Sequence, residues 1–362
     1  MKSINQETLL ALTRCGIGGS VPYITDMVEW EELQKLATEQ GVDAVVLDGI
    51  EKILSDRRPP KDMLLQWIGN TLQSYEYRYK DYCKAIAELA SFYNSHGYKM
   101  MVLKGYACSL DWPKPEHRPC GDIDIWQFGK QKEADEALAA SLKFQDLGVK
   151  IDTSHHHHTV FDWKGFTVEN HYDFINVHHH KSNVAFEAIL KKLGQDDSHY
   201  VEVDGERIYL PSHNLHALFL LKHLMMHFAA EGIMLRQVLD WGFFVEKHCG
   251  EVDWNYVLGV LDRFGMRNMF NILNAICVGD LGFDVKIFPT VQFDPTLKDK
   301  VLKEIVSPQY ETMPPKNIFK RVVFKLRRWK DNEWKHKLCY NDSMRSAFWS
   351  GVWGHLMKPS SI

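Results

Sequence analysis

The sequence feature that most constrains this chain is a pair of aspartates separated by one isoleucine, in the segment GDIDIW. Successive side chains of a β-strand point to opposite faces, so Asp122 and Asp124 share one face while Ile123 and Ile125 share the other. Two like charges about 6 to 7 Å apart are unfavourable without a cation between them, and Mg²⁺ prefers such hard oxygen ligands. The pattern indicates either a magnesium site on one face of a sheet or, without a metal, a solvated strand face.

A glycine turn precedes this strand. The segment YKMMVLKG predicts an apolar strand over 98–103 that ends at Lys104 and Gly105, where glycine permits a sharp turn and a close approach to a phosphate. A second glycine, Gly121, opens the strand that carries the aspartates. A strand, a Lys-Gly turn, a short helix and an Asp-x-Asp strand are therefore expected in that order.

This order, completed by Arg118-x-x-Gly-Asp-Ile-Asp-Ile, resembles the DNA polymerase β-like nucleotidyltransferase superfamily. More narrowly, it is similar to a bacterial group labelled nucleotidyltransferase family protein. The resemblance implies that Gly105 and Gly121 shape the nucleotide-binding turn, and that Lys104 and Arg118 offset phosphate charge. The chain departs from the superfamily where Lys104-Gly105-Tyr106 replaces the usual Gly-Gly or Gly-Ser, so its contacts with phosphate are expected to differ.

The resemblance also implies a third carboxylate from a later strand. Around the Lys-Gly turn at 164–165, the β-branched and aromatic residues of HHHHTVFDW and FTVENHYDF predict a β-hairpin. In the second arm, alternation places Glu169, His171 and Asp173 on a polar face. The opposite face is predicted to hold Phe166, Val168, Tyr172 and Phe174. The resemblance selects Glu169 as the third metal ligand, with Asp173 and Asp162 as alternatives.

Composition limits the class of protein. The chain has 362 residues, of which 45% are hydrophobic and 25% charged, so it has room for more than one globular domain. A formal net charge of −4 argues against a protein that coats nucleic acid. The seven cysteines are scattered without a Cys-x-x-Cys pair, and no signal-peptide pattern or membrane-span pattern is present. We therefore expect reduced thiols and a cytoplasmic location.

Periodicity and punctuation divide the chain into three segments. Residues 1–97 have apolar residues at helical spacing, with glycines at the expected helix ends. Residues 98–210 hold the predicted strands, including VKIDTS and a hairpin at an Asp-Gly pair, and residues 211–362 return to a helical pattern. We therefore expect an α+β fold in which helical N-terminal and C-terminal regions flank a small mixed β-sheet nucleotidyltransferase core.

Two histidine runs, at 155–158 and 178–180, invite a metal interpretation. Histidines alternate across a strand, so at most every second one in the first run is expected to face a given site. No thiolate or carboxylate stands at a zinc-site spacing from them. We interpret the runs as polar residues beside the active cleft, with His157 or His171 as candidates for contact with phosphate. A His-dependent metallohydrolase remains an alternative function.

A predicted helix pair follows the strands. The first helix places His216, His223 and His227 on one face, and the second carries Leu-Arg-x-x-x-Asp, as in the narrower group. The resemblance puts Arg236 near phosphate. The alternative is ordinary helix packing, with Asp240 paired to Arg236 at i,i+4.

The segment from Lys316 to Lys337 mixes nine basic residues with phenylalanine and tryptophan. Such a segment could bind nucleic acid, an anionic head group or an acidic substrate. An amphipathic helix with its basic face in water accounts for the same pattern without a partner, and it is the interpretation we favour.

The resemblance implies transfer of a nucleoside monophosphate from an NTP, with ATP as the expected donor, to an unidentified acceptor hydroxyl, releasing pyrophosphate. Asp122, Asp124 and Glu169 would hold two Mg²⁺ ions. The acceptor, whether a small molecule, a protein or RNA, is not indicated by the sequence. A catalytically inactive nucleotide-binding or partner-binding protein of the same fold is a further alternative, which the Lys-Gly-Tyr turn favours.

Overall fold

The computed structural model describes residues 2–144, 150–155, 157–177, 180–289, 292–310 and 317–344. The chain forms two compact units, each assembled from separate chain segments. Unit 1 comprises Met1–Tyr77, Asp111–Pro119 and Leu221–Tyr340. Unit 2 comprises Arg78–Leu110, Cys120–Leu220 and Asn341–Ile362. The division into 1–97, 98–210 and 211–362 stays a prediction.

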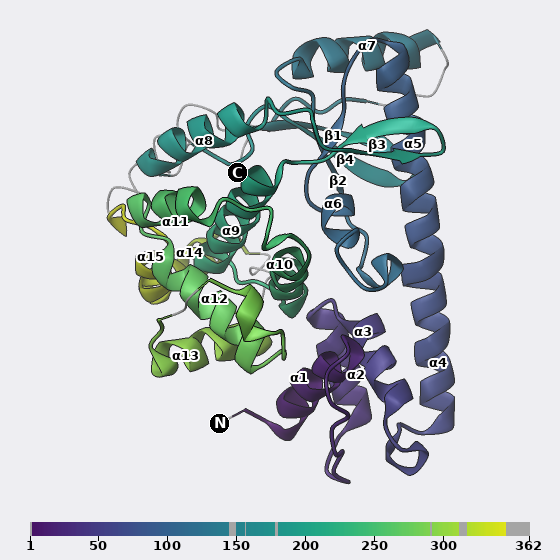
Figure 1. Ribbon diagram of the computed structural model, residues 1–362, viewed down its shortest axis with the longest axis vertical. Coiled ribbons are helices and arrows are strands. Elements are labelled where there is room, and N and C mark those ends of the chain that lie inside the picture. Colours follow the sequence, from purple (N-terminus) through teal and green to yellow (C-terminus); the bar gives the residue numbers. More distant parts are fainter. Residues whose placement is uncertain are drawn as a thin grey trace. The chain divides into compact units, whose positions relative to one another are not determined.

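Unit 2 is built on a six-stranded mixed sheet with the strand order β3-β4-β2-β1-β6-β5. Figure 1 labels β1, β2, β3 and β4 of this sheet. The strands are β1 (Met101–Val102), β2 (Ile123–Trp126), β3 (His158–Trp163), β4 (Phe166–His171), β5 (Tyr200–Val203) and β6 (Glu206–Tyr209). β1 and β6 are parallel, as are β2 and β4, while the other neighbours are antiparallel. The predicted α+β class with a mixed sheet is confirmed.

Both predicted hairpins are present. The turn between β3 and β4 has φ angles of 55° at Lys164 and 81° at Gly165, and the turn between β5 and β6 has 51° at Asp204 and 80° at Gly205. Positive φ at both central residues is typical of a type I′ turn, whose twist matches that of the flanking strands. The predicted strand VKIDTS is wrong for residues 150–154, which form a single bridge through Asp152 rather than a strand.

The two faces of the sheet in unit 2 differ because the strands alternate. Ile123, Ile125 and Val168 are buried in one core with α5 (Arg78–Ser95) and α7 (Gln131–Phe144). The helix α5 contributes several fully or nearly fully buried side chains to this core, namely Tyr82, Ala85, Ile86, Leu89, Ala90 and Tyr93. The opposite face of β2 carries Asp124, so the core fixes which way the carboxylate points.

One predicted apolar position lies on the other face of the sheet. Phe174 stacks on Trp126 with ring centroids 4.3 Å apart, whereas Phe166 and Val168 lie in the core under α5. The strand β4 ends at His171, so period-2 alternation no longer applies at residue 174. The expectation that Phe174 shares the face of Val168 is therefore wrong.

The remaining helices of unit 2 are short or peripheral to the sheet core. They are α6 (Tyr106–Ser109) and α8 (Lys181–Leu193), while α9 (His213–Ala230) contributes residues to both units. The sequence did not predict α8. Its N-cap, His180, makes no side-chain capping hydrogen bond, so the usual start signal is missing.

Unit 1 is helical in the part of the chain that the structure describes. Its α-helices are α1 (Ile4–Gly16), α2 (Trp30–Glu39), α3 (Asp43–Lys52), α4 (Lys61–Thr71), α10 (Leu235–His248), α11 (Trp254–Arg263), α12 (Arg267–Gly279), α13 (Pro295–Val306), α14 (Ile318–Asp331) and α15 (Glu333–Cys339). Shorter helical segments are η1 (Ser55–Arg57), the π-helical η2 (Leu72–Tyr77), η3 (Pro115–His117) and η4 (Val285–Ile287). Gly41 of unit 1 and Gly97 of unit 2, the glycines predicted to end helices, have positive φ angles of 64° and 80°.

The basic, aromatic segment 316–337 forms two helices, α14 and α15, rather than one. Lys335 is only 2% exposed, and its ammonium lies 2.6 Å from Glu304. Part of the positive charge of this segment is therefore neutralised by an ion pair within unit 1. Lys316 lies outside the described residues. Among the residues that the structure describes, no helix combines the length and the apolar character needed to cross a membrane. All seven cysteines are free thiols.

Candidate active site

Two of the predicted carboxylates meet on one face of β2 and β4. These strands are parallel neighbours, and their register sets Asp124 directly opposite Glu169. One ligand atom each from Asp124, Glu169 and His171 lies within 4.8 Å of the others. Glu169 therefore lies beside Asp124, as the alternation of side chains along the strand and the family resemblance led us to expect. Its role as a metal ligand stays a prediction.

The third predicted carboxylate, Asp122, lies one residue before β2 and is exposed. Its backbone carbonyl accepts a hydrogen bond of 2.8 Å from the Tyr82 hydroxyl, which ties the start of β2 to α5. Its charge also acts on Lys104, as do the charges of Asp124 and Glu169. The three carboxylates thus share one cation.

Lys104 is that cation. Its ammonium lies 2.7 Å from Asp124 Oδ1. Burial lowers the pKa of Lys104, but the three carboxylates raise it more, so the pKa is above its usual value. Lys104 therefore balances negative charge of the protein itself in this structure. The predicted contact between Lys104 and a phosphate stays a prediction.

His171 joins the carboxylates through one ring nitrogen. Its Nε2 lies 3.0 Å from Asp124 Oδ1 and 3.5 Å from Glu169 Oε2. Its Nδ1 lies 3.1 Å from the backbone oxygen of Asp173. Because a carbonyl oxygen can only accept, Nδ1 carries a proton and Nε2 is the atom presented to the carboxylates.

The charges in this cluster shift one another's pKa values. Burial raises the pKa of Asp124, but the Lys104 charge and the His171 hydrogen bond outweigh it and hold the pKa well below its usual range. Burial raises the pKa of Glu169, but the hydrogen bond from His171, together with the charges of His158 and His171, outweighs burial and lowers the pKa overall. Burial lowers the pKa of His171, yet hydrogen bonds to both carboxylates raise it overall. Both carboxylates are therefore ionised near neutral pH.

Two histidines of the first run lie beside this cluster. The ring centroid of His158 is 4.3 Å from that of His157 and 5.4 Å from that of His171. The strand β3 begins at His158, and His157 lies in a bend, so alternation does not separate these neighbours. The expectation that only every second histidine faces one site is therefore wrong. His156, His178 and His179 lie outside the described residues.

Burial keeps these two imidazoles neutral. It lowers the pKa of His157 to about 3, with help from the neighbouring imidazoles of His158 and His171. It also lowers the pKa of His158 to about 4, although the charge of Glu169 opposes the shift. At neutral pH both rings therefore have a nitrogen lone pair to offer.

Glycine is required at the turn after β1. Gly105 has φ 55° and ψ −100°. A Cβ there would lie 2.6 Å from the Tyr82 hydroxyl oxygen and 3.3 Å from the backbone oxygen of Asp122. By contrast, a Cβ at Gly121 would meet no described atom within 4 Å. The close backbone approach predicted for the turn is therefore built at Gly105, while phosphate binding by either glycine stays a prediction.

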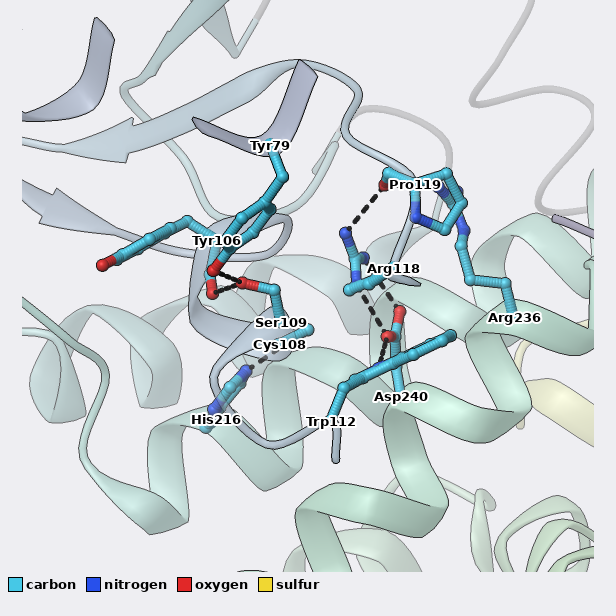
Figure 2. Close-up of polar contacts among 10 residues, drawn as sticks. All are labelled: Tyr79, Tyr106, Cys108, Ser109, Trp112, Arg118, Pro119, His216, Arg236 and Asp240. Atoms are coloured by element: carbon cyan, nitrogen blue, oxygen red, sulfur yellow. Dashed lines mark hydrogen bonds and ion pairs between the residues drawn. The ribbon is translucent and has the colours of Figure 1, made fainter. Parts of the chain in front are cut away.

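Arg118, predicted to face phosphate, is engaged within unit 1. Figure 2 shows its guanidinium pointing at Asp240, with Nε 2.8 Å from Oδ1 and Nη2 2.9 Å from Oδ2. Trp112 Nε1 donates to the same carboxylate at 2.9 Å. The side chains of Arg118 and Asp240 are each 7% exposed. Arg118 thus forms a buried bidentate ion pair, and its role toward phosphate stays a prediction.

Arg236 lies close to Pro119 and Gly41 in the same unit. Its Nη1 lies 3.4 Å from the backbone oxygen of Pro119. A Cβ on Gly41 would lie 3.4 Å from the side chain of Arg236, so the two segments are in contact. Helix periodicity predicted Asp240 as the partner of Arg236, but it could not indicate Arg118 and Trp112 as partners of Asp240. The phosphate role of Arg236 stays a prediction.

The predicted histidine helix, α9, uses its histidines in different ways. His216 is buried in unit 2, with Nε2 3.7 Å from the sulfur of Cys108 (Figure 2). In unit 1, the Nε2 atoms of His223 and His227 lie 3.2 Å apart. The last two form a side-by-side pair of the kind that i,i+4 spacing produces.

Comparison with known proteins identifies a family for this chain. A family model described as an uncharacterised nucleotidyltransferase matches residues 26–278, which is well over half of the chain. No curated protein and no solved structure matches the chain significantly. The matched range includes the Lys-Gly turn, Asp122 and Asp124, and Glu169. The chain therefore belongs to the family of uncharacterised nucleotidyltransferases.

Proposed function

We propose that the protein is a Mg²⁺-dependent nucleotidyltransferase that transfers a nucleoside monophosphate from an NTP, with ATP as the expected donor, to an acceptor hydroxyl. Pyrophosphate would be released. The observation that carries the proposal is the parallel register of β2 and β4, which sets Asp124 opposite Glu169 on one sheet face. Membership of a nucleotidyltransferase family supports the reaction class.

The residues present fit a divalent metal. Asp124 and Glu169 are ionised, and their oxygens are hard ligands of the kind that Mg²⁺ prefers. Their negative charge already attracts polar partners in this structure. The Lys104 ammonium contacts Asp124, and His171 contacts both Asp124 and Glu169. Asp122, exposed at the start of β2, would complete the ligand set for one or two ions. When bound, Mg²⁺ would neutralise charge on the triphosphate and on the attacking oxygen.

The chain's own residues would bind and orient the nucleotide. Gly105 brings the backbone of the turn close to the start of β2, and only glycine fits there. Lys104, next in the chain, places its ammonium beside Asp124 and could shift to an entering phosphate with little movement of the backbone. A triphosphate at this turn would therefore meet a cation that is already in place. Arg118 and Arg236 remain proposed phosphate contacts.

A second function has one observation in its favour. The neutral imidazoles of His157 and His158 lie beside the carboxylates, and histidine with carboxylate is a ligand set found in metallohydrolases. With water as the acceptor, the same cluster would hydrolyse the nucleotide. An inactive protein of this fold would bind NTP without turnover.

The test is a screen of labelled NTPs with Mg²⁺, in which pyrophosphate release is measured with small-molecule, protein and RNA acceptors. The proposed transferase releases pyrophosphate only with an acceptor, and the labelled nucleotide becomes attached to that acceptor. Release without an acceptor, with free nucleoside monophosphate as product, would point to the hydrolase. Asp122→Asn serves as the matched inactive control, because the substituted side chain is exposed and similar in shape.

A further inference from the structure

We propose that His157, His158 and His171 form a binding site for a first-row transition-metal ion, with Zn²⁺ as the best match. The site lies on the β3–β4 hairpin of unit 2. Its three imidazole donors are not part of the proposed magnesium site, and it selects a different ion, although Glu169 lies next to both sites. It does not depend on the proposed transferase reaction.

The hairpin brings the three rings together. His158 and His171 are direct partners in the register of β3 and β4. The backbone oxygen of His157 accepts hydrogen bonds from the amides of Tyr172, at 2.8 Å, and Asp173, at 3.2 Å. One ring nitrogen from each histidine lies within 4.8 Å of the other two. Backbone hydrogen bonds and strand pairing therefore hold the backbones of the three histidines next to one another.

The ring nitrogens are arranged as metal ligands usually are. In the described part of the chain, Nδ1 of His157 and Nδ1 of His158 are buried and have no hydrogen-bond partner. A buried polar atom without a partner is costly, and a bound ion is one recognised explanation for it. The Nδ1 of His171 donates to the backbone oxygen of Asp173, which is how a metal-binding histidine is commonly oriented.

Nitrogen donors select the ion. Mg²⁺ and Ca²⁺ prefer oxygen ligands, whereas imidazole suits Zn²⁺ and its neighbours in the first transition row. Donors on a tetrahedral zinc lie about 3.4 Å apart, given Zn–N distances near 2.1 Å. The ring nitrogens lie within 4.8 Å of one another, so they need to approach by at most about 1.4 Å. Glu169 offers a fourth donor, since its Oε2 lies 3.9 Å from His158 Nδ1 and 3.5 Å from His171 Nε2.

The exposed pair on α9 must be removed from any metal titration. His223 and His227 are adjacent on the helix surface and could bind the same ions weakly through their Nε2 atoms. All proteins in the test therefore carry His227→Gln. His155 provides a matched control within the same run, because it is 47% exposed and is not a member of the three-ring cluster.

The test is a Co²⁺ titration of the full chain after treatment with a chelator, followed by visible absorption and then by Zn²⁺ competition. We expect one Co²⁺ per chain with the intense bands of a low-coordinate nitrogen site, displaced by one Zn²⁺. His157→Gln and His158→Gln, each made separately, should weaken Co²⁺ binding by at least about tenfold, and His155→Gln should not. Equal affinity of all four proteins would overturn the proposal.

Two further measurements make the outcome unambiguous. Circular dichroism and thermal unfolding of the metal-free variants identify a misfolded protein, and the two glutamine variants are independent, so one folded variant is enough. Adding Zn²⁺ should raise the Tm of the His155→Gln protein but not that of a folded His157→Gln protein. Asp122→Asn should keep one Co²⁺ per chain, so failure of the imidazole site and failure of the transferase proposal give different results.

Discussion

The Lys104 ammonium lies 2.7 Å from the Asp124 carboxylate, so the negative charge at the centre of the candidate site is balanced by the protein itself. His171 contacts the same carboxylate from β4 at 3.0 Å. Asp124 is therefore both a proposed metal ligand and the partner of Lys104 and His171. Asp122 is exposed, so we expect it to contribute less than Asp124 to the stability of the folded protein.

The Asp122→Asn and Asp124→Asn proteins should consequently differ in their free energy of unfolding. Asp122→Asn should abolish nucleotidyl transfer and leave the free energy of unfolding nearly unchanged. Asp124→Asn should abolish transfer and also destabilise the protein by about 3 kcal/mol, because it leaves the Lys104 ammonium without its nearest counter-charge. Urea unfolding and pyrophosphate release, measured on both variants, check this. Full turnover in either folded variant would contradict the metal assignment.

A methyl group at the turn should conflict with α5. Gly105→Ala should cost about 2 kcal/mol, because the backbone there has φ 55° and the new Cβ would lie 2.6 Å from the Tyr82 hydroxyl oxygen. Tyr82→Phe removes that oxygen, so Gly105→Ala should be less costly in the Tyr82→Phe background. A double-mutant cycle of unfolding free energies measures the difference. An additive cycle would mean that the hydroxyl is not the obstacle.

The buried pair of Arg118 and Asp240 should be strongly coupled. Asp240→Leu alone should destabilise the protein by about 3 kcal/mol, because the buried Arg118 guanidinium loses its counter-charge and both of its hydrogen bonds to Asp240. Arg118→Met combined with Asp240→Leu should recover much of that loss, since no buried charge then remains. Thermal and urea unfolding of the two single variants and the double variant provide the measurement. A double variant that is no more stable than Asp240→Leu would rule out this coupling.

The pH dependence of stability should contain a contribution from Glu187. Burial raises its pKa from 4.5 to about 7, against hydrogen bonds from the amides of Phe174 and Ile175. Between these two pH values the folded state binds more protons than the unfolded state, so stability falls as the pH rises from about 4.5 to about 7. The total change should be on the order of 3 kcal/mol, and it should level off above the upper value.

Glu187→Gln should flatten that part of the pH profile. The measurement is the free energy of unfolding in urea at several pH values between 4.5 and 7. Glu133→Gln, at an exposed position on α7, is the control and should keep the wild-type slope. An unchanged slope in Glu187→Gln would assign the pH dependence to other groups.

The basic residues of α14 should contribute to the affinity for an anionic acceptor. Arg327 and Lys330 are exposed, so Arg327→Gln with Lys330→Gln should raise the acceptor KM and not the nucleotide KM. The rise should shrink as salt increases, because exposed charges are screened. Lys335→Gln is the contrasting variant. It should instead destabilise the protein, since Lys335 is buried against Glu304. Equal acceptor KM values at low salt would leave α14 as a solvated helix.

Local sequence signals were sufficient for much of the fold. Period-2 alternation predicted the faces of Asp124 and Glu169, and Lys-Gly and Asp-Gly pairs predicted both hairpins. The region 1–97 was predicted to be helical, but α3 was not identified as a separate helix within it, because α3 is buried on nearly all sides and so lacks an amphipathic pattern. Its buried residues are Asp43, Ala44, Val45, Val46, Leu47, Gly49 and Ile50.

Parts of the site depend on contacts that the sequence does not encode locally. Arg118 and Asp240 are distant in the chain, so their pairing required the tertiary structure. The adjacent His157 and His158 reach one cluster because a bend precedes β3, and a rule based on regular strands could not foresee it. Glu169 was selected only through the family resemblance, since parity alone left Asp173 and Asp162 as candidates.

The helix α5 gives the sheet its hydrophobic support although it precedes residue 98 in the chain. A fragment limited to 98–210 would keep every strand but would expose the apolar sides of Ile123, Ile125 and Val168 to water, and such surfaces promote aggregation. The chain also passes between the two units after Tyr77, Leu110, Pro119, Leu220 and Tyr340. Neither unit can be excised as one continuous piece, so gene fusion or shuffling could transfer this site to another protein only with both units together.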